Sequence, residues 1–245
     1  MRIDSEKCVG CFRCIPYCPV GAIKRSGDIA TIDQDECVEC GTCLRAEVCK
    51  VNAIYWPELT WPRLVRQAFS AVVVGYDAFA KAVGHPERSG GGGRGTEEMK
   101  TNDVTGRFKD GEVGIAVEMG RPQVGTYFRD LEKVAKVIAK MGAEFETENP
   151  VTVLLDTKTG ELKFPEIRDE KVLSAIIECK IKQEKAIALL KEIGNVSKEI
   201  DTVFSVDIIN KCKNGIIPFK AELDEAGIKV RINGKTCIGL GRVPK

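Results

Sequence analysis

The sequence of 245 residues lacks a long hydrophobic run. Its most apolar window, residues 68–76, is about half as long as a bilayer-spanning helix must be. The first residues, Met1-Arg2-Ile3-Asp4, lead directly into a charged stretch and lack the apolar segment of a secretory signal. We therefore expect a cytoplasmic protein with no targeting segment and no membrane span.

Aromatic residues and histidine are scarce, and neither sign of charge is in excess. Only 6% of the residues are aromatic, which leaves few stacking platforms for single-stranded nucleic acid. The formal net charge is +1, which favours neither nucleic acid nor an anionic membrane as a partner. The single histidine, His85, precedes Pro86 in a segment that breaks secondary structure. We expect it in an exposed loop, which excludes a Ser-His-Asp or Cys-His catalytic set.

Cysteine is abundant, and its placement is uneven. Eight of the eleven cysteines fall between Cys8 and Cys49, whereas Cys179, Cys212 and Cys237 are scattered. Such crowding predicts metal binding, because the disulfides of a secreted scaffold are spread more evenly along a shorter chain. The three scattered cysteines have no Cys-x2-Cys partner, so we expect buried structural thiols there.

The eight clustered cysteines form two runs with matching flanks. The runs are Cys8-x2-Cys11-x2-Cys14-x3-Cys18-Pro19 and Cys37-x2-Cys40-x2-Cys43-x5-Cys49. An Ile-Asp pair begins five residues before each run, and a Val-x-Ala-Ile segment follows each fourth cysteine. The segment is therefore an internal duplication. Structural zinc is the alternative, but zinc uses two Cys-x2-Cys pairs per ion, which interleaved triplets fit poorly.

Residues 1–57 resemble the two-cluster bacterial ferredoxins in both runs and in the duplication. The resemblance implies a small βαββαβ module with two [4Fe–4S] clusters, in which the fourth cysteine of each run crosses to the other cluster. The implied ligands are Cys8, Cys11, Cys14 and Cys49 for cluster I, and Cys37, Cys40, Cys43 and Cys18 for cluster II. The longer spacing before Cys49, and Lys50 in place of the usual proline, depart from the family pattern in the loop around Cys49.

The charge of the module favours a low reduction potential. Residues 1–58 contain nine acidic and seven basic side chains, and each oxidised cluster with its four thiolates adds two negative charges. Negative charge disfavours an added electron, so we expect low-potential one-electron transfer, of a kind that suits an anaerobic niche. Phe12 and Tyr17, which lie among the first ligands, either shield a cluster from water or fill the small core.

Residues 58–109 predict a connecting segment. Two Trp-Pro steps, Trp56-Pro57 and Trp61-Pro62, are stiff, and we expect their tryptophans to pack within the chain. A helix is predicted over Arg63–Val83, although three consecutive valines and a glycine near its middle weaken the pattern.

A glycine-rich stretch, residues 89–95, follows that helix. It has neither a Gly-Lys-Ser/Thr motif nor a preceding strand, so it predicts a linker and not a phosphate-binding loop. The polar residues 96–107 are a candidate binding loop.

Residues 110–245 predict a second α+β domain. The expected elements are a half-buried strand Val113–Val117, helix Thr126–Met141, strand Val151–Leu155, strand Ile177–Ile181, helix Gln183–Ile193 and strand Val203–Ile209. This order predicts a ferredoxin-like antiparallel sheet with both helices on one face. It resembles the ACT-type regulatory domains only at the level of the fold, which says little about function. A final hairpin is predicted over residues 229–238.

No catalytic set stands out in this second domain. Glu118, beside Gly120, is the first carboxylate to examine, although a solvated strand end explains it better. We predict an electron-transfer protein or oxidoreductase subunit whose C-terminal domain docks a redox partner or forms a homodimer. Two alternatives stay open. One is a redox enzyme with an active site in the C-terminal domain, and the other is a regulator that responds to redox state or to a ligand.

Overall fold

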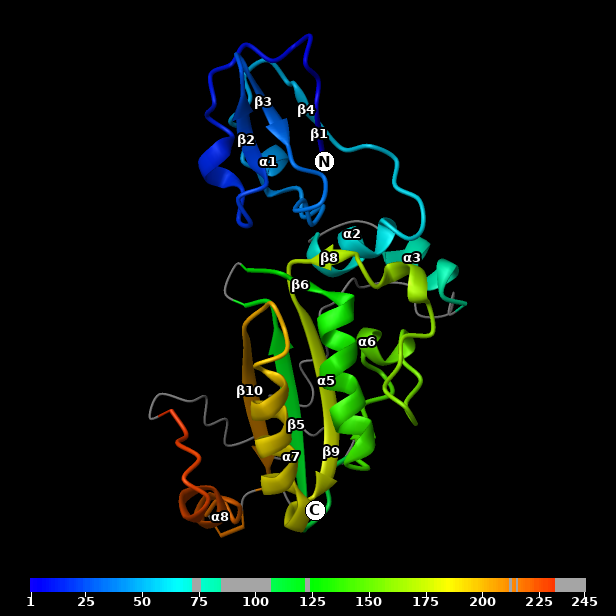
Figure 1. Cartoon of the computed structure of the whole chain (residues 1–245), viewed down its shortest axis with the longest axis vertical. Helices are drawn as coiled ribbons and strands as arrows, with labels where there is room; N and C mark the ends of the chain where they lie inside the picture. Colours follow the sequence, from blue (N-terminus) through cyan, green and yellow to red (C-terminus); the bar gives the residue numbers. More distant parts are fainter. Residues whose placement is uncertain (72–75, 85–106, 122–123, 212, 215, 232–245) are drawn as a thin grey trace. The chain divides into compact units, whose positions relative to one another are not determined.

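The computed structural model describes the chain except for residues 72–75, 85–106, 122–123, 212, 215 and 232–245 (Figure 1). The chain divides into two compact units. The first is Met1–Arg94, Gly120–Arg129 and Phe164–Ala175, and the second is Gly95–Met119, Asp130–Lys163 and Ile176–Lys245. Helix and sheet are mixed in both units, as the sequence predicts.

The N-terminal part of the first unit consists of short elements. They are β1 (Arg2–Ile3), η1 (Ile15–Tyr17), β2 (Ile23–Ser26), β3 (Ile29–Ile32), α1 (Thr42–Arg45) and β4 (Ile54–Tyr55). β1 pairs with β4 and β2 pairs with β3, both antiparallel, so the module has two two-stranded sheets. Where the predicted βαββαβ order has its first α-helix, the structure has the 3-10 helix η1, and Pro16 lies near the start of η1.

The core of this module is small, and cysteines make up much of it. Its buried members are Met1, Cys14, Ala22, Ile23, Ala30, Cys37, Cys43 and Ile54. Three of these eight residues are cysteines, and two are alanines. So few large apolar side chains give little hydrophobic stabilisation to a chain segment of this length.

The rest of the first unit is built around two helices. α2 (Leu64–Ser70) and α3 (Tyr76–Ala82) replace the single helix that the sequence predicts over residues 63–83. That prediction was wrong because Ala71 is extended, and the valine-rich run that follows it is a poor helix former. Phe69 in α2 makes edge-to-face contacts with Phe79 and Phe128, at centroid distances of 5.5 Å and 5.6 Å.

Two short strands and a turn complete this unit. η2 (Pro165–Ile167) precedes β8 (Lys171–Val172), and β8 pairs with β6 (Thr126–Tyr127). α2 lies on β8, where the hydroxyl of Ser70 accepts a hydrogen bond of 2.9 Å from the Leu173 amide. These contacts fix α2 within the unit.

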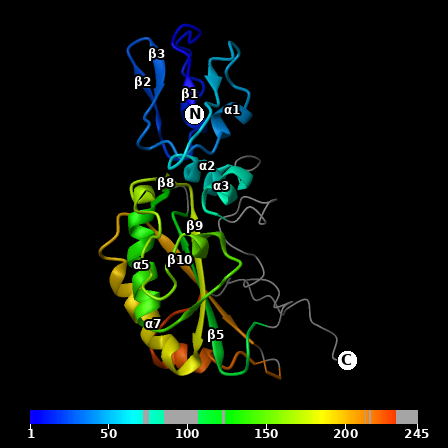
Figure 2. The same cartoon turned by 90° about the vertical axis from the view of Figure 1, so that its right-hand side faces the viewer.

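The second unit contains one four-stranded sheet with strand order β10-β5-β9-β7. The strands and their helices are β5 (Glu112–Met119), α5 (Phe128–Lys140), β7 (Glu144–Phe145), β9 (Ala175–Lys182), α7 (Gln183–Val196) and β10 (Phe204–Asn210). β10 runs antiparallel to β5, and β7 runs antiparallel to β9. Figures 1 and 2 show α5 and α7 on the same face of this sheet. A short helix, α8 (Lys220–Glu225), follows β10.

Two expectations about this sheet were wrong. β5 is not half-buried, because every one of its residues is buried. Residues 150–153 form a helix, α6 (Pro150–Val153), where the sequence predicts a strand over Val151–Leu155. The side chain of Asn149 caps α6 by accepting a 2.7 Å hydrogen bond from the Val151 amide, and proline occupies the first helical position. An asparagine cap followed by proline is a strong helix-start signal. The sheet therefore has the two-residue strand β7 in place of the predicted strand over Val151–Leu155.

Gly160 is expected to be essential for the stability of the second unit. Its φ is +75°, and an added Cβ would lie 2.4 Å from the backbone of Ala135. Gly160→Ala should therefore lower the free energy of unfolding by at least about 3 kcal/mol. Gly142 has a similar φ of +73° but open space around its Cβ position. Gly142→Ala should cost only about 1 kcal/mol, and denaturant unfolding of both variants would measure the difference. Equal losses in both variants would contradict the packing argument.

Candidate iron–sulfur centre

The loops that carry the cysteines repeat an unusual backbone conformation. Positive φ angles recur at equivalent places in the two runs, in the pairs Gly10 and Glu39, Phe12 and Gly41, and Gly21 and Asn52. Residues other than glycine rarely adopt this conformation. Alternation of right- and left-handed residues turns successive backbone N–H groups inward, which makes a concave site for anionic groups such as iron–sulfur clusters. The sequence duplication is therefore also a duplication of backbone geometry.

The first group of thiols gathers around Cys14. Burial raises the pKa of the Cys14 thiol, and the thiols of Cys11, Cys8 and Cys49 raise that pKa further. The structure thus brings Cys49, from the end of the second run, next to three cysteines of the first run. Cys11 is exposed, whereas Cys8 and Cys49 are partly buried.

The second group of thiols gathers around Cys43. Burial raises the pKa of the Cys43 thiol to about 12, and Cys40, Cys37 and Cys18 raise it as well. The same four cysteines line one cavity of about 290 Å³, together with apolar residues such as Val20. Cys37, Cys40 and Cys43 are buried, so this group is more enclosed than the first.

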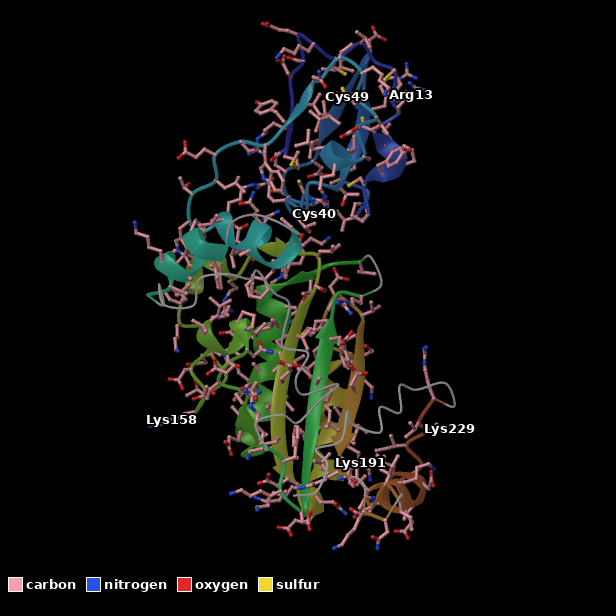
Figure 3. All side chains as sticks on the ribbon, turned by 180° about the vertical axis from the view of Figure 1, so that it is seen from behind. Arg13, Cys40, Cys49, Lys158, Lys191 and Lys229 are labelled. Atoms are coloured by element: carbon pink, nitrogen blue, oxygen red, sulfur yellow. The ribbon has the colours of Figure 1, made fainter. Side chains whose placement is uncertain are left out.

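Figure 3 shows Cys49, of the first group, at one end of the module with Arg13, and Cys40, of the second group, at the other end. The grouping coincides with the crossed ligand sets that the ferredoxin resemblance implies.

The sulfur atoms of the two crossing cysteines have equivalent hydrogen bonds. The Ala22 amide donates to Cys18 Sγ at 3.1 Å, and the Ala53 amide donates to Cys49 Sγ at 3.2 Å. Cys40 Sγ also lies 3.3 Å from the Thr42 hydroxyl. Amide hydrogen bonds to sulfur stabilise the negative charge of cluster thiolates.

The chemistry of the donor set fits clusters. Every ligand candidate is a thiol, and all nine cysteines in the described part of the chain are free of disulfides. Among the described residues, no three Cys, His, Asp or Glu side chains converge tightly enough to hold a single metal ion. Thiols around a cubane cluster stand further apart, because each binds a different iron corner.

Comparison with known proteins agrees with this geometry. A family described as "4Fe-4S binding domain" matches residues 1–23. A ferredoxin of Alicyclobacillus acidocaldarius is 43% identical over 58 residues, which are 23% of this chain and 72% of that ferredoxin. The chain belongs to the ferredoxins.

Two further relatives, both named as parts of larger enzymes or complexes, match the ferredoxin module. Pyruvate synthase subunit PorD of Methanothermobacter marburgensis is 44% identical over 52 residues, which are 21% of this chain and 58% of PorD. A component of the ion-translocating oxidoreductase complex of Methanosarcina acetivorans is 43% identical over 47 residues, which are 19% of this chain and 17% of that component. The chain thus spans less than two thirds of these two relatives. No solved structure matches the chain.

Iron–sulfur electron transfer of the ferredoxin type follows for the N-terminal module. Among the described residues, no helix has the length and hydrophobicity that a membrane crossing requires.

The two tryptophans at the border of the ferredoxin module, Trp56 and Trp61, pack within the chain, as predicted. Trp56 covers Gly41, where an added Cβ would lie 2.8 Å from the indole ring. Trp61 stacks edge-to-face on Phe164 and donates a 2.7 Å hydrogen bond to Glu166.

Phe12 and Tyr17, which lie between cysteines of the first run, differ in burial. Phe12 is partly buried against the core, with the guanidinium of Arg25 above its ring at 4.5 Å. Tyr17 is 45% exposed, so it does not fill the core.

The remaining candidate residues are separate from the thiol groups. Cys179 in β9 is fully buried, as predicted, whereas Cys212 and Cys237 lie outside the described residues. Glu118 is 9% exposed in the buried strand β5, so the expectation of a solvated strand end was wrong. His85, the glycine-rich residues 89–95, most of the polar stretch 96–107 and most of the predicted hairpin also lie outside the described residues.

Cys179 predicts how stability depends on pH at the alkaline end. Burial raises the pKa of this thiol from 9.0 to about 12. The unfolded chain therefore releases this proton above pH 9 while the folded chain retains it, so the free energy of unfolding should fall as pH rises from about 9 to 12. The slope from this group is at most about 1.4 kcal/mol per pH unit. In Cys179→Val that extra slope should vanish in denaturant titrations, and an unchanged slope would contradict a neutral buried thiol.

Sequence reasoning did not identify two residues that bind the second cysteine loop, Arg63 and Arg66. Arg63 is the N-cap of α2 and Arg66 lies in its first turn. Both are outside residues 1–58, the segment whose acidic and basic side chains were compared above. The one local signal is that two arginines three positions apart on a predicted helix share a face. It does not point to the cysteine loop, because 13 residues, β4 among them, separate Cys49 from Arg63. Both side chains contact the loop that carries the second thiol group.

Proposed function

We propose that this chain carries two [4Fe–4S] clusters and relays single electrons through them to or from an oxidoreductase partner. Cluster I would be held by Cys8, Cys11, Cys14 and Cys49, and cluster II by Cys18, Cys37, Cys40 and Cys43. The observation that carries the proposal is the crossed grouping of thiols, in which Cys49 joins the first run and Cys18 joins the second. When bound, each cluster supplies one reversible electron transfer.

The two thiol groups differ in solvent exposure, which supports a relay in which one cluster lies close to the surface. Cys11 is exposed and its neighbour Val9 is 68% exposed, so the first thiol group lies near solvent. The second group is enclosed by buried cysteines and by the apolar wall of its cavity. Electron exchange with a partner protein needs one cluster close to the surface, and the first group meets this requirement.

The names of two relatives, one from pyruvate synthase and one from an ion-translocating oxidoreductase complex, support a role within an oxidoreductase complex. We propose that residues 1–57 are the cluster module, that residues 58–109 connect it, and that residues 110–245 dock the partner or form a homodimer. The free thiols of the described cysteines fit a reducing, cytoplasmic location.

The experiment is anaerobic reconstitution followed by iron and sulfide analysis and by EPR of the dithionite-reduced chain. The proposal predicts about eight irons and eight sulfides per chain, with broadened signals from two interacting clusters. One of the relatives is named Ferredoxin 7Fe. A content of about seven irons per chain would mean that one of the two clusters lacks an iron atom. About four irons would mean that one thiol group does not hold a cluster, and the two-cluster relay would be abandoned.

A second candidate function rests on a pocket in the second unit, beside β7 and β9. It is lined by apolar and charged residues, among them Phe108, Phe145, Glu144 and Lys180. Such a mixed lining is typical of small-ligand sites, which favours a ligand-responsive regulator. A thermal-shift screen of small metabolites against Lys180→Ala and the parent chain tests it, and the absence of any stabilising compound would remove this candidate.

A further inference from the structure

One guanidinium of α2 reaches into the loop that carries the second thiol group. Arg66 is only 5% exposed, and its Nη1 donates to three backbone carbonyl oxygens of that loop. The acceptors are Gln34 at 3.1 Å, Asp35 at 2.8 Å and Cys37 at 2.9 Å. Its Nε pairs with Glu170, which holds the guanidinium from the other side. A buried charge with this many acceptors is fixed in place.

A second guanidinium lies one helical turn earlier. Arg63 donates to the Gln34 carbonyl at 3.1 Å and to the Gln34 side chain at 2.9 Å. Its Nε donates at 2.8 Å to Glu39, whose carboxylate is fully buried next to Cys40. Glu39 occupies the position that Gly10 has in the first run, so only the second half of the duplication has this carboxylate to bind Arg63.

A third guanidinium belongs to the module itself. Arg45 at the end of α1 donates to the Cys40 carbonyl at 2.7 Å. Two of the four cysteines in the second group therefore have their backbone carbonyls bonded to arginines, Cys37 to Arg66 and Cys40 to Arg45.

The charges around the second group do not cancel. The Met1 ammonium and four guanidiniums, those of Arg2, Arg45, Arg63 and Arg66, face two carboxylates, Glu39 and Glu170. Arg66 and Glu39 are buried and Arg63 is largely covered, so the field of these groups is weakly screened, whereas Arg45 is exposed. The first group is different, because its exposed Cys11 and Val9 border on water, which screens charges strongly.

From these contacts we infer that Arg63 and Arg66 are potential-setting residues of cluster II. The inference rests on the proposed two-cluster function and extends it to a part of the chain outside the ferredoxin module. Reduction adds one negative charge to a cluster, and fixed positive charges nearby favour that state. The two arginines therefore raise the reduction potential of cluster II selectively, offsetting the burial and negative charge that lower it. α2 thus tunes the enclosed end of the relay, and cluster I exchanges electrons at the surface.

The size of the effect follows from Coulomb attraction. A unit charge about 10 Å away, at an effective dielectric constant of about 20, shifts a one-electron equilibrium by roughly tenfold. Glu170 and Glu39 weaken this field. We therefore expect each Arg→Gln change to lower the ratio of reduced to oxidised cluster II by about threefold to tenfold at a fixed ambient potential.

The test is an EPR-monitored potentiometric titration of the full chain. Arg66→Gln and Arg63→Gln are each introduced into a Cys49→Ala background, in which only cluster II remains, and into a Cys18→Ala background, in which only cluster I remains. Arg129→Gln is the matched control, because Arg129 is an ion-paired arginine of the same unit whose partner Asp169 is 83% exposed. Arg66→Lys retains the charge but loses the forked hydrogen bonding.

The expected result is a lower potential of cluster II in both glutamine variants, with cluster I unmoved and with Arg129→Gln unmoved at both clusters. Arg66→Lys should keep the potential close to that of the parent even where it lowers thermal stability, which separates tuning from mere support of the fold. Potentials of cluster II that stay at the parent value in Arg66→Gln and Arg63→Gln would overturn the inference, and equal shifts at both clusters would do so too. If instead the parent chain takes up only about four irons, the proposed function itself fails, and the iron analysis shows this before any titration.

Discussion

Replacing Cys49 by alanine is expected to halve the iron content of the reconstituted chain, from about eight to about four atoms. Cys18→Ala should have the same effect, because each crossing cysteine supplies the fourth ligand of one cluster. Cys179→Ala is the control, since Cys179 is buried in β9 of the other unit and should leave the iron content unchanged. The measurement is iron and sulfide analysis after anaerobic reconstitution.

Double variants test the crossing itself. If Cys49 belongs with Cys14, then Cys49→Ala with Cys14→Ala damages one cluster only and should retain about four irons. Cys49→Ala with Cys43→Ala damages both clusters and should leave almost none. If the variant with Cys43→Ala retained about four irons and the variant with Cys14→Ala retained almost none, each run would hold its own cluster. That result would contradict the grouping of thiols in the structure.

Removing the clusters is expected to unfold the N-terminal module while the four-stranded sheet of the second unit remains. The buried core of the module contains eight residues, three of which are cysteines, and its strands are two to four residues long. The free energy of cluster binding is then largely the free energy of folding of this module. Limited proteolysis of the apo-protein should cut within residues 1–57 first and should spare α5, α7 and the strands between them.

The matched comparison is the reconstituted chain under the same protease, with EDTA-treated and re-reconstituted protein as the reversibility control. Protection of the module that is equal in the apo- and cluster-loaded proteins would contradict coupled folding. It would mean that the hydrogen bonds and small apolar core suffice without the clusters.

The parts of the fold with strong local signals could be predicted from the sequence. The alternation of Ile177, Cys179 and Ile181 with charged residues predicted β9, and the periodic apolar residues from Leu131 to Ile138 predicted α5. The family resemblance implied the crossed cysteine sets, and the structure brings the same residues near one another, while their binding of clusters stays a prediction.

Other features were not predicted, for two different reasons. Val151–Leu155 has the composition of a strand, and the prediction gave too little weight to the local helix-start signal of the Asn149 cap and Pro150. The helix predicted over residues 63–83 is interrupted at the extended Ala71, next to the valines that weaken the pattern, and Phe69 of α2 packs on Phe79 of α3 and on Phe128. The contacts of Arg63 and Arg66 with the second cysteine loop span about 30 residues of sequence, so neither propensity nor periodicity could predict them.

The most direct measurement is an anaerobic coulometric titration of the reconstituted chain, with EPR spin quantitation at each step. Two clusters that relay single electrons should take up about two electrons per chain at low potential, and the fully reduced protein should show about two spins. Uptake of about one electron per chain, or two electrons with a signal from a single cluster, would contradict the two-cluster relay.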